Sequence, residues 1–310
     1  MSSNSAPSIL SPPRFALGDT LGLVAPASPP EKPELIDETI ARLTSYGFKI
    51  KAGQYLRERD SYLAGTDEER AADISACFKD PEVKGIFALR GGYGSCRILP
   101  LLDYAAIRAN PKPFIGYSDI TAMHNAILVK AGLITFHGSN GSSAFQPGNE
   151  ATCRRLLLDG EGSTPVLFSR ETSLRREIKT VIPGRVTGRL IGGNMTCLLR
   201  LIGTPYEPDF RGVILFLEDT GEKAYRVDGM FTHLRLAGIL SQIGGLVIGQ
   251  FDHADPQEEK RIQDRLQVEA EGIGVPSITG APIGHFAEQV MLPHGAEVEL
   301  DAAEGSVKLK

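Results

Sequence analysis

The chain has 310 residues, of which 42% are hydrophobic and 23% charged, a composition typical of soluble globular proteins. Its formal net charge of −5 provides no basic face, so nucleic-acid binding is disfavoured. No apolar run approaches the roughly 20 residues that span a bilayer. The four cysteines match no metal-ligand spacing and indicate free thiols in a reducing compartment. We therefore expect a soluble cytoplasmic protein with no metal, no membrane partner and no nucleic-acid partner.

The length and the change of pattern along the chain predict two domains, although one large α/β domain is an alternative. Residues 1–13 are rich in Ser and Pro and predict a disordered tail, because they lack the basic and apolar regions of a signal peptide. We place an N-terminal α/β domain at residues 14–165, a linker at residues 166–184 and a C-terminal domain at residues 185–310.

The N-terminal half alternates strand patterns with helical patterns. The predicted strands span residues 21–25, 48–52, 85–89, 113–115 and 133–136. Predicted helices cover residues 35–46 and 66–78, the second opened by a capping box of Thr66 and Glu69, and another helix follows Ser118. Repeated β-α units predict an α/β fold in which helices cover both faces of a parallel sheet.

The C-terminal half alternates less regularly. Its predicted strands span residues 186–191, 213–217, 246–251, 275–278, 297–300 and 307–309. Its predicted helices lie near residues 195–201, 227–240 and 257–269.

Ser118 lies where a buried strand gives way to a helix, in the segment Gly116-Tyr117-Ser118-Asp119. A serine on such a turn projects its hydroxyl clear of the sheet, beside the free N–H groups of a helix N-terminus. Those donors can stabilise an oxyanion, so this serine is a candidate nucleophile. The segment lacks the second glycine of a full G-x-S-x-G motif, and an ordinary Ser or Asp helix cap is the alternative.

A glycine-rich loop, Arg90-Gly91-Gly92-Tyr93-Gly94-Ser95, follows the strand at residues 85–89. Such loops bring backbone N–H groups close to a phosphate or to a developing oxyanion. The loop lacks the G-x-G-x-x-G pattern and a Walker lysine, so nucleotide binding is disfavoured and a structural turn is the alternative. Loops at the carboxyl ends of neighbouring parallel strands share one crevice, so we expect this loop to lie near Ser118.

Glu218 and His285 are candidates for the rest of a catalytic site. Glu218 ends the apolar strand at residues 213–217, where a carboxylate is held rigidly and can orient a histidine. The alternative is a solvated acidic pair formed with Asp219. His285 lies between small and apolar residues after the strand at 275–278, and of the six histidines it is the best placed to be half buried. A purely structural histidine is the alternative.

Several other polar residues allow two interpretations. His137 ends a strand of the first domain and ranks second among the histidines, as a binding or a structural residue. His124 is predicted to point away from the Ser118 turn, and His253 lies in a loop that supplies no defined metal coordination set. Asn194 opens a helix after Gly192-Gly193, where it is either an N-cap or a substrate-binding residue.

Taken together, six ordered motifs resemble the LD-carboxypeptidase family of serine peptidases, which also contains the microcin C immunity peptidases. The motifs are residues 90–95, 116–121, 135–138, 192–194, 216–219 and 282–285, and the resemblance extends over residues 18–310. It implies an N-terminal Rossmann-like α/β domain and a C-terminal domain built around a swivelling β-sheet. The site would lie between them, often in a homodimer.

The resemblance also implies a Ser-Glu-His triad, whose matching residues are Ser118, Glu218 and His285. His285 would take the proton of Ser118 as the serine attacks an amide carbonyl, and Glu218 would orient the imidazole. Backbone N–H groups at Gly92 and Asp119 would form the oxyanion hole. No cofactor is required.

The implied substrate is a small peptide, the murein tetrapeptide, from which such enzymes remove the terminal D-Ala during cell-wall recycling. Asn194, Arg90 and Lys223 are the candidate donors for the substrate carboxylate. The first alternative is a microcin C-type immunity peptidase that cleaves an aminoacyl-adenylate analogue. The absence of Trp and the short connection from Glu218 to His285 disfavour it, because those relatives stack aromatic residues on the base.

Two other classes of protein are alternatives. A non-catalytic cleft-binding protein would keep the two domains without turnover, but the presence of all three triad residues disfavours it. A flavodoxin-like nucleotide- or flavin-binding protein is disfavoured because the chain has no phosphate loop and contains a second domain.

Overall fold

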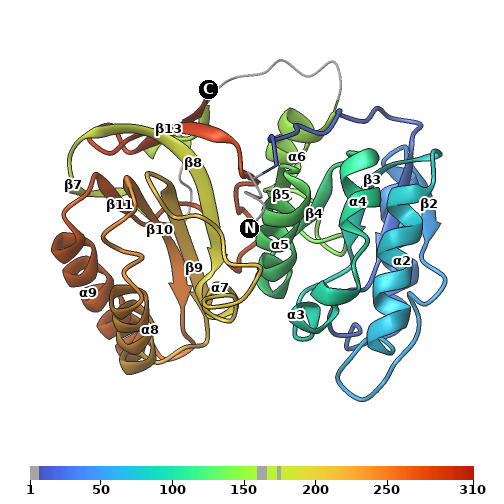
Figure 1. Ribbon diagram of the computed structural model, residues 1–310, viewed down its shortest axis with the longest axis horizontal. Coiled ribbons are helices and arrows are strands. Elements are labelled where there is room, and N and C mark those ends of the chain that lie inside the picture. The colour runs from blue at the N-terminus through green and yellow to red at the C-terminus, as the bar shows by residue number, and fades with distance from the viewer. Residues whose placement is uncertain (1–6, 159–165, 173–175) are drawn as a thin grey trace, which may run out of the picture.

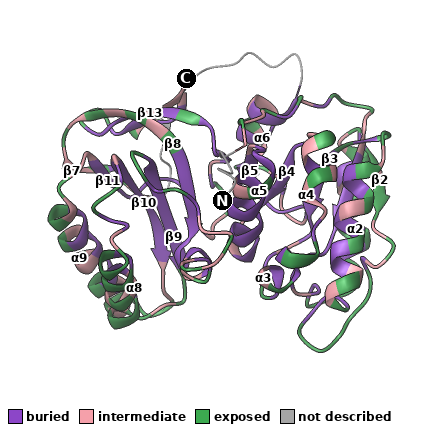
Figure 2. Ribbon diagram, in the orientation of Figure 1, coloured by how far each residue is buried: buried purple, intermediate pink, exposed green. Residues whose placement is uncertain are grey.

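Two β-sheets, one in each half, organise the computed structural model, which describes residues 7–158, 166–172 and 176–310 (Figure 1). The first sheet has six strands in the order β12-β5-β4-β3-β1-β2, and the second has eight in the order β6-β14-β13-β8-β9-β10-β11-β7. Figure 2 shows that the strands of both sheets are mostly buried, whereas the outer helices expose one face. The predicted α/β fold class is confirmed.

The first sheet is parallel except at its β12 edge. Its strands are β1 (Thr20–Val24), β2 (Lys49–Ala52), β3 (Val83–Ala88), β4 (Phe114–Gly116), β5 (Thr135–His137) and β12 (Leu292–His294). The accompanying helices are α1 (Glu34–Ser45), α2 (Asp67–Lys79), α3 (Ser95–Ile98), α4 (Tyr104–Ala109), α5 (Thr121–Ala131) and α6 (Glu150–Leu157). The strand order reverses between β1 and β3, and ligands of open α/β sheets bind at such a point, beyond the carboxyl ends of the strands.

Helix α5 lies between the two halves of the molecule (Figure 1). Nearly all of its side chains are buried, including polar ones such as His124 and Asn125. A helix that is apolar on every side is stable only where it is enclosed, and α5 packs against both β5 and the second-sheet strand β8 (Arg185–Asn194). The segment after Ser118 is therefore fixed by both domains.

The second sheet is mixed, with a parallel centre and antiparallel edges. Besides β8, its strands are β6 (Val166–Phe168), β7 (Lys179–Ile182), β9 (Ile214–Thr220), β10 (Gly245–Asp252), β11 (Ser277–Thr279), β13 (Glu297–Asp301) and β14 (Ser306–Leu309). Its helices are α7 (Met195–Leu199), α8 (Ala224–Leu236) and α9 (Pro256–Ile273).

Three features differ from the simplest two-domain picture. The segment predicted as a linker, residues 166–184, contributes β6 and β7 to opposite edges of the second sheet. Strand β12, from the C-terminal half, instead joins β5 of the first sheet. In the predicted disordered tail, the described residues 7–13 pack on the body, because Leu10 exchanges backbone hydrogen bonds with the segment around Leu133. Residues 1–6 lie outside the described part.

In the described ranges 7–158, 166–172 and 176–310, no helix combines the length and apolar character required to cross a membrane. The longest helix, α9, is rich in charged residues on its outer face.

Candidate active site

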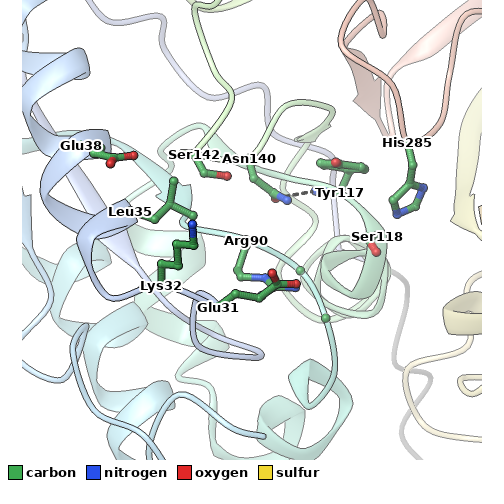
Figure 3. Close-up of a pocket in the computed structure, with 12 residues that line it drawn as sticks. Glu31, Lys32, Leu35, Glu38, Arg90, Tyr117, Ser118, Asn140, Ser142 and His285 are labelled. Atoms are coloured by element: carbon green, nitrogen blue, oxygen red, sulfur yellow. Dashed lines mark hydrogen bonds between the residues drawn. The ribbon is translucent and has the colours of Figure 1, made fainter.

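A pocket of about 400 Å³ opens beyond the carboxyl ends of the strands of the first sheet (Figure 3). The segments after β1, β3, β4 and β5 line it, and one residue comes from the connection between β11 and β12. The lining consists of Glu31, Lys32, Leu35, Glu38, Arg90, Gly91, Gly92, Tyr117, Ser118, Asn140, Ser142 and His285. The glycine-rich loop and Ser118 thus share one crevice, as the parallel-sheet pattern predicts.

Ser118 starts a single 3₁₀ turn, Ser118–Ile120, directly after β4, and α5 continues from it. Its backbone φ is +65°, in the left-handed region, where a side chain typically costs about 1–2 kcal/mol. Backbone strain of this kind persists where the surrounding structure holds it, and it is concentrated at functional sites. The strained turn places the half-buried Ser118 side chain at the pocket wall.

Gly91 is the point at which the glycine-rich loop meets Ser118. A Cβ atom at Gly91 would lie 2.9 Å from the Ser118 Cβ and 3.2 Å from its Oγ, so a side chain there would collide with the serine. The loop is anchored by the Tyr93 N–H, which donates to Ser28 Oγ at 3.0 Å. The predicted oxyanion donors, the N–H groups of Gly92 and Asp119, belong to the two segments that meet at Ser118.

Glu218 and His285 form a hydrogen-bonded pair. Glu218 lies near the end of β9 with its side chain fully buried, and its Oε2 is 2.9 Å from Nδ1 of His285. When Nδ1–H donates to the carboxylate, Nε2 is the nitrogen left free to accept a proton. Figure 3 shows His285 and Ser118 on the same side of the pocket, and both residues line it.

The environment of His285 makes it a stronger base than an ordinary histidine. Burial lowers the pKa of His285, but the negative charge of Glu218 and its hydrogen bond outweigh that effect, and the pKa is raised above 6.5. Asp219 and Asp252 add smaller contributions in the same direction. The pair can therefore take a proton from a hydroxyl and stabilise the resulting imidazolium.

The three predicted substrate-binding residues lie in different places. Arg90 lines the pocket, and its Nη1 donates to the Pro29 carbonyl at 3.1 Å. Asn194 is buried and is the N-cap of α7, because its Oδ1 accepts from Cys197 N–H at 3.1 Å. Lys223 is exposed ahead of α8 and is not part of the pocket lining. Of these three, only Arg90 faces the candidate site.

One wall of the pocket was missed by the sequence analysis. Glu31 and Lys32, just before α1, and Glu38, inside it, line it opposite Ser118 and His285 (Figure 3). Charged residues in and just before an exposed helix are typical of solvated surface, so their pattern carries no local signal. The rule that the loops after neighbouring parallel strands share a crevice would have identified this wall, because the segment follows β1.

Three other histidines considered from the sequence lie outside the pocket lining. His124 contacts the end of β4, since its Nε2 lies 2.8 Å from the Gly116 carbonyl oxygen, so it supports the strand before Ser118. His137 is fully buried, and neither ring nitrogen has a hydrogen-bond partner among the described residues. Burial lowers the pKa of His137 well below its ordinary value, which keeps the ring neutral. His253 Nδ1 accepts from Asp255 N–H at 3.0 Å in its loop.

Within the part of the chain that the structure describes, no group of three or more His, Cys, Asp or Glu side chains is arranged to hold a metal ion.

The backbone of Ser118 allows a test on stability. We expect Ser118→Gly to unfold at a higher temperature than Ser118→Ala, with a difference of roughly 1 kcal/mol, because glycine adopts φ +65° without steric strain. Thermal unfolding of the two variants in parallel measures this difference, and neither variant carries the hydroxyl. An alanine variant as stable as the glycine variant would mean that the turn is not strained.

The site defines a class of protein. A serine on a strained strand-to-helix turn, together with a histidine held by a buried carboxylate, is the arrangement used by serine hydrolases on several unrelated folds. Residues 21–138 match the model of the LD-carboxypeptidase N-terminal domain, and residues 187–300 match that of the LD-carboxypeptidase C-terminal domain. The chain belongs to the LD-carboxypeptidase family and is a serine-type carboxypeptidase.

Individual relatives cover nearly the whole chain. The probable murein peptide carboxypeptidase of Bacillus subtilis is 37% identical over 93% of this chain and 90% of its own length. The microcin C7 self-immunity protein MccF of Escherichia coli is 30% identical over 93% of this chain and 92% of its own length.

Solved structures of both kinds of relative superpose on the model. MccF in complex with aspartyl sulfamoyl adenosine has a TM-score of 0.83 and 28% identity, covering 97% of this chain and 98% of that one. Muramoyltetrapeptide carboxypeptidase from Oxalobacter formigenes has a TM-score of 0.74 and 31% identity, covering 94% and 97%. The predicted family is thereby confirmed.

Proposed function

We propose that this chain removes the terminal D-Ala from murein tetrapeptides by cleaving the amide between an L-centre and D-Ala, with Ser118 as nucleophile. The observation that carries the proposal is the grouping of Ser118, on a strained turn, with His285 in one pocket, where His285 is bonded to the buried Glu218. The names of the murein-directed relatives support the choice of substrate.

The proposed reaction has two steps. Ser118 Oγ attacks the scissile carbonyl carbon while Nε2 of His285 accepts its proton, and the N–H groups of Gly92 and Asp119 receive the oxyanion. The imidazolium, stabilised by Glu218, then protonates the amine of D-Ala, which leaves an acyl ester on Ser118. Water, activated by the same imidazole, hydrolyses this ester and releases the shortened peptide.

Charged side chains of both signs line the pocket and suit a zwitterionic peptide. Lys32 and Arg90 provide positive groups for the substrate carboxylates, and Glu31 and Glu38 provide negative groups for an ammonium such as that of diaminopimelate. The proposal thus keeps Arg90 from the predicted binding residues and adds Lys32. Asn194 and Lys223 lie outside the pocket lining and have no part in it.

The role of Arg90 can be tested by kinetics. We expect Arg90→Ala to raise KM for the tetrapeptide roughly 10- to 10²-fold, since a hydrogen bond to a charged group is worth about 1.5–3 kcal/mol. The KM of Arg90→Lys should fall between those of Arg90→Ala and the wild type, because lysine keeps the charge but loses the planar donor pair. Arg57→Ala is the matched control, since Arg57 is exposed and paired with Asp37 away from the pocket lining. An unchanged KM in Arg90→Ala would remove Arg90 from substrate binding.

A second candidate function is hydrolysis of an aminoacyl-adenylate analogue, favoured by the structural likeness to MccF in complex with aspartyl sulfamoyl adenosine. Against it, Tyr117 is the only Phe, Tyr or Trp among the residues that line the pocket in the described structure, and its ring packs on His285 with the centroids 4.9 Å apart. Among the described residues that line the pocket, no second aromatic ring is present to stack on a base.

A direct comparison of substrates distinguishes the two functions. The purified protein is incubated separately with L-Ala-γ-D-Glu-diaminopimelate-D-Ala and with aspartyl sulfamoyl adenosine, and the products are quantified by mass spectrometry. Release of D-Ala at the higher kcat/KM supports the murein activity, whereas release of aspartate at the higher kcat/KM overturns it in favour of the second function. The homodimer implied by the family resemblance and the cytoplasmic location expected from the composition stay predictions.

A further inference from the structure

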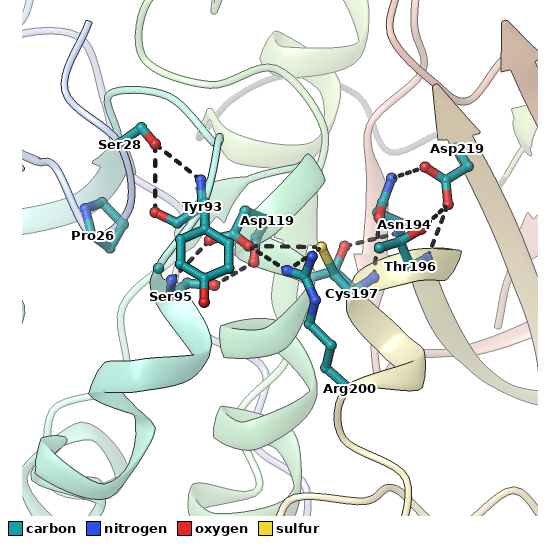
Figure 4. A network of polar contacts seen from close by, with 12 residues as sticks. Pro26, Ser28, Tyr93, Ser95, Asp119, Asn194, Thr196, Cys197, Arg200 and Asp219 are labelled. Atoms are coloured by element: carbon teal, nitrogen blue, oxygen red, sulfur yellow. Dashed lines mark hydrogen bonds and ion pairs between the residues drawn. The ribbon is translucent and has the colours of Figure 1, made fainter. Parts of the chain in front are cut away.

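The residues that directly follow Ser118 and Glu218 are both buried aspartates, Asp119 and Asp219, and neither lines the pocket. Both carboxylates contact the region of α7, the short helix after β8. Figure 4 shows them on opposite sides of the side chains that α7 presents.

Asp219 holds the N-terminal end of α7. Its Oδ1 accepts from Asn194 Nδ2 at 2.9 Å, and its Oδ2 accepts from both the backbone N–H and the hydroxyl of Thr196, each at 2.9 Å. Asn194 in turn caps the helix through Cys197 N–H. The strand end that carries Glu218 is therefore bonded to the first turn of α7.

Asp119 holds the C-terminal end of the same helix. Its Oδ1 lies 3.3 Å from Nη1 of Arg200, the C-cap residue, and 3.7 Å from the Cys197 thiol. Its Oδ2 accepts from Ser95 N–H at 2.8 Å, which connects it to the end of the glycine-rich loop. The turn that carries Ser118 is therefore bonded both to α7 and to the loop that supplies Gly92.

A direct contact reinforces this arrangement. Asn194 N–H donates to the hydroxyl of Thr121, in the first turn of α5, at 2.9 Å. At Gly193, where φ is +127°, a Cβ atom would lie 2.5 Å from the Thr121 Oγ1, so a side chain there would collide with Thr121. The backbone of the β8–α7 junction thus packs directly on the Thr121 side chain of the first domain.

Burial of the two carboxylates makes the positions of their hydrogen-bond donors important. A buried carboxylate is tolerated only when hydrogen bonds replace its hydration. Asp219 has donors from α7 and its N-cap, and Asp119 has the Ser95 N–H besides Cys197 and Arg200. Charge-assisted hydrogen bonds are short and directional, so they fix the positions of the groups they join. Catalytic groups displaced by about 1 Å can lose about 10²-fold in rate.

We propose that Asp119 and Asp219 are positioning residues that, by gripping opposite ends of α7, hold the Ser118 turn of one domain and the Glu218–His285 pair of the other in register. The inference rests on the proposed function, because it assumes that these three residues act together. The carboxylates of the two aspartates act as one unit through α7 and do not touch the substrate, whereas the backbone N–H of Asp119 keeps its separate role in the proposed oxyanion hole.

The test uses Asp119→Asn, Asp219→Asn and the double variant of the full chain. For each, kcat and KM are measured with the tetrapeptide, and the rate of covalent labelling of Ser118 by a fluorophosphonate is measured without substrate. We expect each single variant to lose roughly 10–10²-fold in kcat and in labelling rate, with KM changed less than about threefold. The double variant should lose no more than the worse single variant, since residues that act as a unit are not additive.

Two matched controls separate positioning from a general effect of burying an amide. Asp73, in the first domain, and Asp301, in the second, are buried carboxylates that accept backbone N–H groups from Tyr55 and Glu304, respectively. Asp73→Asn and Asp301→Asn should keep the wild-type kcat and labelling rate. If Asp119→Asn or Asp219→Asn fails to fold, Thr196→Val and Arg200→Gln replace them in the test. Each removes one donor to an aspartate, and each should lower kcat roughly fivefold.

Three outcomes overturn the inference. Labelling rates and kcat values of Asp119→Asn and Asp219→Asn within about twofold of wild type would exclude a positioning role. Losses in the control variants as large as those in Asp119→Asn would show only the general effect of burying an amide in place of a carboxylate. Multiplied losses in the double variant would show that the aspartates act separately. A wild-type protein that the fluorophosphonate does not label would overturn the proposed nucleophile itself, which distinguishes failure of the function from failure of the positioning role.

Discussion

Ser118→Ala is expected to lower kcat for D-Ala release by roughly 10⁴- to 10⁶-fold, the size of loss seen when the nucleophile of a catalytic triad is removed. The methyl group keeps the volume of the turn but cannot form the acyl ester. Steady-state assays of D-Ala release measure the effect, and far-UV circular dichroism checks that the fold is retained.

The matched control for this substitution is Ser45→Ala, at the exposed end of α1, where the hydroxyl bonds only within its own helix turn, to the Arg42 carbonyl. It should keep wild-type activity. Equal D-Ala release by Ser118→Ala and the wild type would show that another group is the nucleophile.

Glu218→Gln is expected to lower kcat by about 10⁴-fold, as when the acid of a Ser-His-Asp triad is replaced by its amide. The amide is nearly isosteric, but it cannot stabilise the imidazolium of His285. It can also turn its NH₂ group toward Nδ1, which favours the wrong tautomer. A loss below about tenfold would mean that Glu218 does not orient His285 in the reaction.

The pH dependence of kcat/KM in the wild type and in Glu218→Gln gives an independent check. His285 must be neutral to accept a proton, and Glu218 raises its pKa, so wild-type kcat/KM should fall as the pH drops through a value above 6.5. In Glu218→Gln the carboxylate charge is lost, the pKa of His285 falls, and the acidic limb of the residual activity should move to lower pH. An acidic limb at the same pH in both proteins would contradict this coupling.

Much of the architecture could be predicted because it depends on local patterns. The β-α repeats of the first domain and the turn at Ser118 are marked by apolar segments that alternate with helical patterns along the chain, and these are local signals. The pairing of Glu218 with His285 joins residues 67 positions apart. It was accessible only through the resemblance to a family, because neither residue carries a pattern that names its partner.

Other features could not be predicted because they depend on contacts between distant segments. Strand β12 pairs with β5 across the domain boundary, although its three residues, Leu-Pro-His, carry no strand pattern. Asn194 has the same sequence pattern whether it caps a helix or binds a ligand. The structure places it as the cap of α7, because Asp219 and Thr121 occupy its polar groups.

The central claim is that Ser118 is the nucleophile and depends on His285. It is tested most directly by treating the protein with a fluorophosphonate and mapping the adduct by peptide mass spectrometry, with and without the tetrapeptide, in wild type and in His285→Ala. The account predicts a single adduct on Ser118 that abolishes D-Ala release, is blocked by the tetrapeptide and forms far more slowly in His285→Ala. An adduct at another residue, or full D-Ala release from protein completely labelled at Ser118, would contradict it.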